Sequence, residues 1–171
     1  EIWNEPDLDP DDSLNKRCWQ GTEAEFAEFY TVASTYLKNR FGKKIYKISL
    51  DAGMTCPNRD GTIDTRGCIF CSEGGSGDFA SSNRLSITDQ ITEGKNRVCR
   101  KIKDTQGTGQ YIAYFQAYTN TYAPIERLRK IYTEAAANDD IAAISIATRP
   151  DCIDEEIMSL IYEIHLIKPV F

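Results

Sequence analysis

Residues 44–71 read KIYKISLDAGMTCPNRDGTIDTRGCIFC, in which a strand pattern runs directly into a loop that carries three cysteines. The first seven residues alternate between two faces, which predicts a first strand. Cys56, Cys68 and Cys71 follow within sixteen residues, with eleven residues between the first two and two between the last two. A C-x2-C pair is a chelate spacing, and Gly67 gives the backbone room to turn before it. Three soft ligands on one loop suit an iron–sulfur cluster or zinc.

The insert between the first two cysteines is rich in turn-forming residues, among them Pro57, Asn58, Asp60 and Gly61. This composition predicts a folded-back loop rather than a helix or a strand. Residues 74–78 (GGSGD) come soon after the loop. Such a glycine-rich stretch either lets backbone amides approach a ligand closely or serves as a plain linker.

Helical and strand patterns alternate along the rest of the chain. Before the quoted stretch, apolar residues at helical spacing predict a helix that begins after Thr22, where Thr22 and Glu25 form a capping box, and ends at Gly42. After the stretch, the expected elements are a helix from about Ser86 to Lys103, a strand over 111–118, a helix opened by Pro124, a buried strand over 141–147, a helix over 154–165 and the start of a fourth strand at 168–171.

This order predicts an α/β fold with parallel strands, because strands joined through helices pair in parallel with right-handed crossovers. Polar loops follow each of the first three strands, over residues 51–77, 119–121 and 148–151. The carboxyl ends of parallel strands meet on one face, so we expect the three loops to converge there. A sheet that stops at the beginning of a fourth strand has an open edge, which suggests a natural protein longer than these 171 residues.

The composition, with 41% hydrophobic and 27% charged residues, is that of a soluble globular domain. Residues 1–20 are expected to be a flexible acidic tail, and residues 21–171 the core domain. The net charge of −6 comes from this tail, because residues 1–12 hold six acidic and no basic residues. The sequence has neither a membrane-span pattern nor a signal peptide, so a cytoplasmic protein is expected.

Six cysteines in a chain without a secretory signal favour metal binding over a disulfide framework. Cys18 lies in the tail, and Cys99 lies beside the apolar stripe of a predicted helix and is expected to be buried and inert. Cys152 follows the third predicted strand, where it either faces the site or has a structural role. The single histidine, His165, is expected at the surface.

Three segments carry a resemblance to a known family: KISLDAGMTCPNRDGTIDTRGCIFCSEGGSGDF (47–79), YFQAYTNTYAP (114–124) and ISIATRPDCI (144–153). They resemble the radical S-adenosylmethionine (SAM) superfamily, specifically its YhcC/YtqA-type branch, which is related to the elongator catalytic subunit. The superfamily's commonest spacing is C-x3-C-x2-C; the eleven-residue gap is a departure that this branch shares, and Phe70 keeps the aromatic position before the last cysteine. The resemblance covers roughly residues 30–171. It implies the N-terminal part of a radical-SAM (β/α)6-type barrel, preceded by an extra N-terminal helix.

The resemblance also implies the chemistry of the cysteine loop. Cys56, Cys68 and Cys71 would hold a [4Fe–4S] cluster, and the enzyme would cleave SAM reductively to a 5′-deoxyadenosyl radical. Phe70 would shape the cluster and adenine pocket. The cofactor-binding candidates on the next two loops are Gln116, Thr119, Asn120 and Arg149. The first three stand where many relatives carry a Gly-Gly-Glu motif for the methionine amino group, while Arg149 either pairs with a carboxylate or phosphate or forms a structural salt bridge.

On the same resemblance, the substrate is a tRNA wobble uridine side chain, and the partners are tRNA, a reducing electron donor such as flavodoxin or ferredoxin, and a candidate partner methyltransferase, with no membrane. Two alternatives remain open. One is a structural zinc module that binds RNA, with Cys152 or His165 as the fourth ligand after the three loop cysteines. The other is an electron-transfer iron–sulfur protein, which would need a fourth cysteine.

Overall fold

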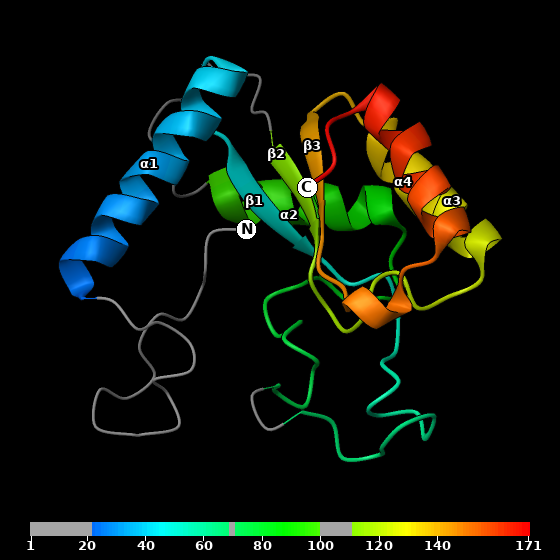
Figure 1. Cartoon of the computed structure of the whole chain (residues 1–171). Coiled ribbons are helices and arrows are strands. Elements are labelled where there is room, and N and C mark those ends of the chain that lie inside the picture. Colours follow the sequence, from blue (N-terminus) through cyan, green and yellow to red (C-terminus); the bar gives the residue numbers. More distant parts are fainter. Residues whose placement is uncertain (1–21, 69–70, 100–110) are drawn as a thin grey trace. The chain divides into compact units, whose positions relative to one another are not determined.

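The computed structural model describes residues 22–68, 71–99 and 111–171 (Figure 1). The chain divides into two compact units, residues 1–45 and residues 46–171. The predicted acidic tail, Cys18 and Phe70 lie outside the described residues.

The first unit contains the predicted N-terminal helix, α1 (Glu23–Phe41). Its capping box is present: the backbone N–H of Thr22 donates to the carboxylate of Glu25 at 2.7 Å, and the N–H of Glu25 donates to Thr22 Oγ1 at 3.3 Å. Gly42 ends the helix with φ 71°, a left-handed conformation that costs glycine little. Both ends of this helix were therefore predicted correctly.

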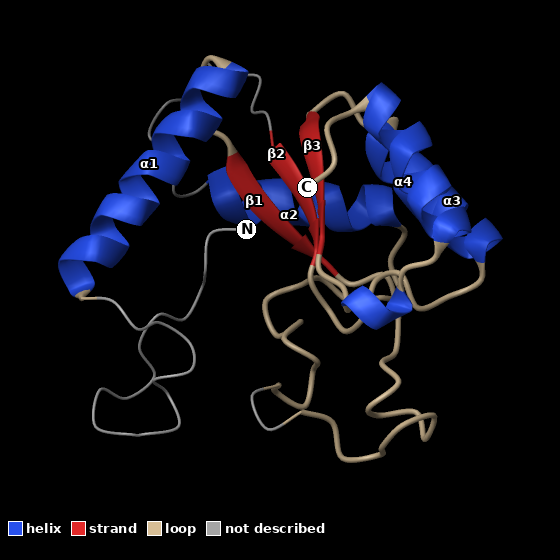
Figure 2. Ribbon diagram, viewed as in Figure 1, coloured by secondary structure: helices blue, strands red, loops and turns tan. Residues whose placement is uncertain are grey.

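The second unit is built on a small parallel sheet in the order β1-β2-β3 (Figure 2). Its strands are β1 (Tyr46–Leu50), β2 (Tyr111–Phe115) and β3 (Ile141–Ile146). The register places Ile48 opposite Ala113 and Ala113 opposite Ile144. The predicted parallel α/β fold is thus present as a three-stranded sheet. Of the expected fourth strand, Val170 forms a single parallel bridge with Ile144.

Helices join and cover the strands. These are α2 (Ile87–Cys99), α3 (Ile125–Ala136) and α4 (Glu155–Ile167), and a short 3-10 turn, η2 (Pro150–Cys152), precedes α4. The predicted end of α2 near residue 103 lies outside the described residues. Strand β2 ends at Phe115, earlier than the predicted residue 118, because Tyr118 takes a left-handed conformation with φ 60° and turns the chain.

The core lies between one face of the sheet and the helices. Alternate strand residues pack with side chains from all three helices, and the most deeply buried include Leu50, Phe115, Ile144, Ile91, Leu128, Tyr132 and Leu160. Phe115 and Tyr132 meet edge to face with ring centroids 5.2 Å apart, a favourable geometry for aromatic rings. This packing fixes the strands, and with them the starting points of the loops that leave their carboxyl ends.

Among the described residues, the structure contains no helix with the length and apolar character needed to cross a membrane.

Candidate functional site

The loops that leave the three strands meet at the carboxyl ends of the strands, as the sequence predicted. Backbone hydrogen bonds join them there: Gln116 N donates to Leu50 O, Thr119 N to Thr55 O, and Asn120 N to Ala147 O, each at 3.2 Å. In Figure 2 these loops gather beyond the ends of the three arrows. The cysteine loop is therefore attached directly to the loop that follows β2.

The cysteine loop folds back on itself. Cys56 O accepts hydrogen bonds from the N–H groups of Arg59 and Asp60 at 2.8 and 3.1 Å, and Asn58 O accepts one from Gly67 N at 2.8 Å. Cys71 N donates to Cys68 O at 3.1 Å, which closes the turn of the C-x2-C pair. Gly67 has φ 75°, as a turn before that pair requires. The predicted folded-back loop and its glycine turn are both present.

Arg59 holds the two limbs of this loop together. Its guanidinium donates to Ser72 O at 2.6 Å and to Glu73 O at 2.9 Å, just beyond Cys71. It also lies 5.7 Å from the ring centroid of Tyr118, in the loop after β2. Because a Cβ on Gly67 would come within 2.7 Å of the Arg59 guanidinium, only glycine lets the arginine lie this close. Sequence reasoning did not identify Arg59, since no periodic pattern signals such a contact.

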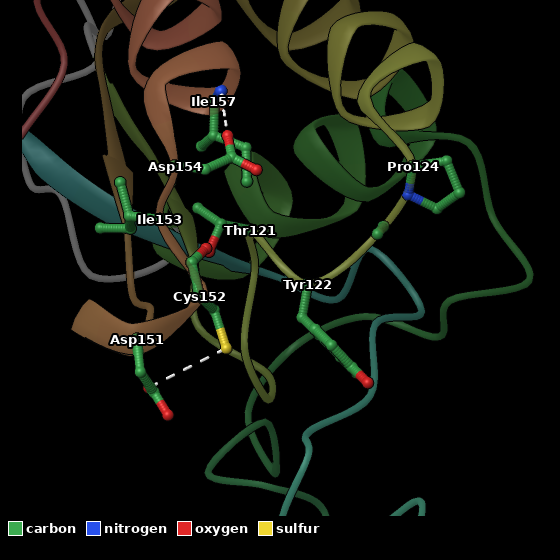
Figure 3. A pocket seen from close by; sticks show the side chains of 9 residues that line it. Thr121, Tyr122, Pro124, Asp151, Cys152, Ile153, Asp154 and Ile157 are labelled. Atoms are coloured by element: carbon green, nitrogen blue, oxygen red, sulfur yellow. Dashed lines mark hydrogen bonds between the residues drawn. The ribbon is translucent and has the colours of Figure 1, made fainter. Parts of the chain in front are cut away.

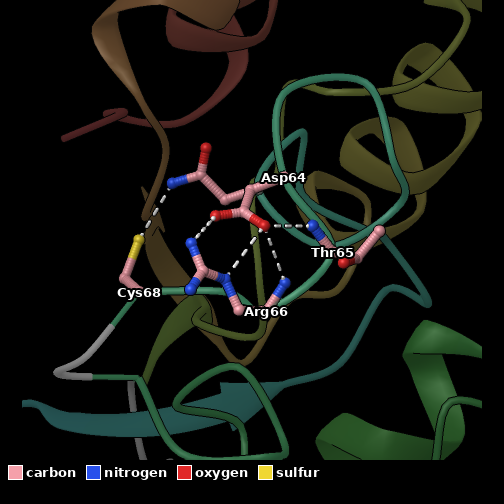
Figure 4. Close-up of polar contacts among 5 residues, drawn as sticks. Asp64, Thr65, Arg66 and Cys68 are labelled. Carbon is pink, nitrogen blue, oxygen red and sulfur yellow. Dashed lines mark hydrogen bonds and ion pairs between the residues drawn. The ribbon is translucent and has the colours of Figure 1, made fainter.

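Each loop thiol has a polar neighbour. The side-chain amide of Asn58 donates to Cys68 Sγ at 3.0 Å, shown as the dashed line that ends on the sulfur in Figure 4. Ser76 lies near enough to Cys71 to lower the pKa of its thiol, and Cys56 near enough to Arg149 to raise the pKa of the guanidinium. Close to Cys68, Asp64 and Arg66 form an exposed ion pair of 3.2 Å (Figure 4). Hydrogen bonds of this kind stabilise thiolates, the form in which cysteine binds metals.

The three thiols also influence one another. Burial raises the pKa of Cys71, the hydrogen bond with Ser76 lowers it, and the negative charges of Cys68 and Cys56 raise it further. Even so, across the described ranges no three His, Cys, Asp or Glu side chains are gathered closely enough to hold a metal ion together. The donor set itself fits a thiolate-ligated metal group, because three soft sulfurs share one loop and have hydrogen-bond donors around them.

Two residues of this region have strained backbones. Ser76 and Tyr118 have φ values of 66° and 60°, which side chains with a Cβ seldom adopt. Tyr118 N donates to Gly75 O at 2.9 Å, and its ring occupies the space that a Cβ on Gly75 would need. Such strain persists only where the surroundings enforce it, and it concentrates at functional sites. Ser76 lies in the loop after β1, which carries the cysteines, and Tyr118 lies in the loop after β2.

The cofactor-binding candidates after β2 lie among these loops, but the side chains of Gln116 and Asn120 already form hydrogen bonds with other residues of the protein. Gln116 Oε1 accepts from Ser49 Oγ at 2.9 Å. Asn120 is fully buried, and its Nδ2 donates to Phe115 O and Ala147 O at 3.0 and 2.9 Å, which ties β2 to β3. Asn120 Oδ1 has no partner among the described residues. Thr119 is 2% exposed. Their contacts with a cofactor stay predictions.

Arg149 forms the structural salt bridge that was one of its two predicted roles. Its Nε and Nη2 donate to the two carboxylate oxygens of Asp151 at 2.9 and 2.7 Å. This bidentate pair lowers the pKa of Asp151 and raises that of Arg149. Arg149 also neighbours Cys56, so it places a positive charge beside the first thiol.

A cavity of about 490 Å³ opens beside this salt bridge, between the loop after β2 and the start of α4 (Figure 3). Cys152 lines it, together with Tyr122, Pro124, Asp151, Asp154 and Ile157, among others. Burial raises the pKa of Cys152, and the charge of Asp151 raises it further, so its thiol is held in the protonated, less nucleophilic form. The hydroxyl of Thr121 donates a hydrogen bond to the carbonyl oxygen of Cys152 at 2.5 Å, which holds this wall of the cavity in place.

The two remaining described candidates lie elsewhere. His165 is exposed near the end of α4, where its Nδ1 accepts from Val170 N at 3.1 Å. Strands and α4 run in opposite directions, so this end of α4 is remote from the loops, and His165 is not placed to be a fourth ligand. Cys99 is exposed, and its predicted burial was wrong. It lies one residue beyond the partly buried Val98, about 100° further round the helix.

Comparisons with known proteins give relatives without an assigned activity. The chain is 46% identical over 136 residues to the uncharacterized protein YtqA of Bacillus subtilis, covering 80% of this chain and 41% of YtqA. It is 39% identical over 127 residues to the protein YhcC of Escherichia coli K12, covering 74% of this chain and 38% of YhcC. It is 33% identical over 143 residues to the uncharacterized protein MJ0486 of Methanocaldococcus jannaschii, covering 81% and 41%.

The chain thus spans about two fifths of the length of these relatives. No family model matches it, and no solved structure does.

Proposed function

We propose that the chain is part of a radical SAM enzyme that binds a [4Fe–4S] cluster through Cys56, Cys68 and Cys71. The observation that carries the proposal is the position of the cysteine loop. It leaves the carboxyl end of β1, where the loops after β2 and β3 also meet. Substrates and cofactors of parallel α/β folds bind at the carboxyl ends of the strands. A three-cysteine loop with hydrogen-bond donors at its sulfurs is suited to a metal group that takes part in chemistry there.

When bound, the cluster supplies the electron for reductive cleavage of SAM. The protein's own residues hold this loop in place. Arg59 keeps the loop closed, and Arg149 places a positive charge near Cys56. The barrel that this activity would require would extend the three-stranded sheet beyond β3, on the side where Val170 forms its bridge with Ile144.

The substrate we propose is a tRNA wobble uridine side chain, which would make the enzyme tRNA-modifying and cytoplasmic. The support is the sequence resemblance of residues 30–171 together with the similarity to YtqA and YhcC. A reducing protein such as flavodoxin or ferredoxin would provide electrons, and a methyltransferase is a candidate partner. The test of this part is nucleoside analysis of tRNA from a strain that lacks the gene, where altered wobble uridines are expected.

A second function is favoured by one observation, the effect of Cys56 on Cys152. Cys152 lies close enough to Cys56 for the charge of that thiol to raise the pKa of Cys152. Cys152 could therefore complete a four-cysteine zinc site with the three loop cysteines, as a structural module would require. The two functions differ in their need for Cys152: a cluster that takes SAM at its fourth iron uses three cysteines, whereas closed zinc uses four.

Anaerobic reconstitution with iron and sulfide separates these functions. We expect about four iron atoms per chain in the unaltered protein, and loss of the cluster in the Cys56→Ser, Cys68→Ser and Cys71→Ser variants. Cys99→Ser, which changes an exposed thiol on α2, is the matched control and should load fully. Cys152→Ser should also load fully. A protein that binds zinc tightly, forms no cluster and loses its metal in Cys152→Ser would contradict the radical SAM proposal.

A further inference from the structure

Asn58 contacts the second limb of the cysteine loop with both its main chain and its side chain. Its carbonyl oxygen accepts the N–H of Gly67 at 2.8 Å, and its side-chain amide reaches Cys68 Sγ at 3.0 Å. The two contacts fall on neighbouring residues, so one asparagine fixes both the backbone turn before the C-x2-C pair and the sulfur of its first cysteine. Asn58 is itself half-buried, and Pro57 before it is buried, which limits the freedom of the side chain.

We propose that Asn58 is a positioning residue whose amide N–H holds the Cys68 sulfur and raises the reduction potential of the metal group bound there. The inference rests on the proposed function, because it presupposes that Cys68 is a ligand. It assigns to Asn58 a role distinct from ligation: the side chain touches the ligand sulfur, not the metal.

The direction of the effect follows from charge. A sulfur ligand of an iron–sulfur group carries negative charge, and more of it after the group gains an electron. A hydrogen bond from a neutral amide stabilises that charge, so it favours the reduced form and raises the potential. The amide must present its N–H side to the sulfur, since its oxygen side would repel a thiolate.

The rest of the loop keeps this contact in place. Arg59, the next residue, donates to Ser72 O and Glu73 O on the far side of Cys71. The C-x2-C pair is thus held on one side by Asn58 and on the other by Arg59. The guanidinium also lies close to Gly67, in the turn that precedes Cys68.

The test measures the midpoint potential of the reconstituted cluster in a redox titration that is monitored by electron paramagnetic resonance. The variants are Asn58→Leu and Asn58→Asp, neither of which has the side-chain N–H donor. Leucine has approximately the shape of asparagine, and aspartate matches that shape more closely but adds a negative charge. Asn96→Leu, at an exposed position of α2, is the matched control. We expect a more negative potential in both Asn58 variants, with the larger shift in Asn58→Asp, and no shift in Asn96→Leu.

Potentials of both Asn58 variants equal to that of the unaltered protein, at full iron content, would overturn the inference and leave the proposed function intact. Absence of a cluster in the unaltered protein would overturn both. If the variants do not fold by circular dichroism, unaltered protein labelled with ¹⁵N at asparagine side chains decides. Its reduced cluster should show magnetic coupling to one ¹⁵N nucleus, which the labelled Asn96→Leu control should retain and unlabelled protein should lack. No coupling would contradict the contact.

Discussion

At the scale of single residues, the Arg149–Asp151 pair makes a prediction about pH. The hydrogen bonds from Arg149 are the largest cause of the lowered pKa of Asp151, whose ordinary value is 3.8. A carboxyl whose pKa falls on folding stabilises the folded state above its ordinary pKa, and that contribution is lost as the pH drops through the lowered value. Arg149→Gln should therefore return the pKa of Asp151 toward its ordinary value.

Carboxyl ¹³C chemical shifts followed against pH measure this change. Asp64 is an internal control, because its pKa is lowered by a different arginine, Arg66. The titration of Asp64 should be the same in Arg149→Gln as in the unaltered protein. An unchanged titration of Asp151 in the variant would show that the pair does not form in solution.

Single residues also show what the sequence could and could not predict. The Thr22–Glu25 capping box and the Gly67 turn were predictable, because local backbone chemistry determines them, whereas metal binding by the three cysteines stays a prediction. The contacts of Asn58 with Cys68 and of Arg59 with residues beyond Cys71 were not, because they depend on how an irregular loop closes on itself.

At the scale of secondary-structure elements, Gly94 decides how closely α2 approaches the sheet. A Cβ at this position would lie 2.3 Å from Ile48 Cγ2, so α2 packs on β1 through the bare backbone of the glycine. Alanine favours helix formation over glycine by about 1 kcal/mol. Overpacking a core costs about 1 to 3 kcal/mol, and here the clash is with a fully buried β-branched side chain.

We therefore expect Gly94→Ala to lower the free energy of unfolding by up to about 2 kcal/mol, despite its better helix propensity. Urea denaturation followed by circular dichroism measures it. Asn96→Ala, on the exposed side of the same helix, should leave stability unchanged or raise it slightly. A Gly94→Ala variant more stable than the unaltered protein would mean that α2 can move away from β1 at little cost.

The elements themselves were largely predictable, and their ends were less so. All three described strands and α1, α3 and α4 lie where hydrophobic periodicity predicted them. Strand β2 ended early because of the left-handed Tyr118, a conformation that tyrosine does not signal in a sequence. Cys99 lies beside the buried stripe of α2, as predicted, but a side chain at that position is exposed and not buried.

At the scale of the whole molecule, the parallel sheet and the convergence of its loops follow from the alternation of strands and helices. The alternation does not determine whether the sheet continues into a barrel, since that depends on further strands. The relatives are more than twice the length of the matched region, so the activity we propose belongs to a longer arrangement than the sheet of Figure 2.

The most direct measurement of the central claim is formation of 5′-deoxyadenosine. The natural full-length protein, reconstituted anaerobically with iron and sulfide, is reduced with dithionite in the presence of SAM, and the product is quantified by chromatography. We predict 5′-deoxyadenosine from the unaltered protein and from Cys99→Ser, and none from Cys56→Ser, Cys68→Ser or Cys71→Ser. A fully loaded, reduced protein that forms no 5′-deoxyadenosine would contradict the account.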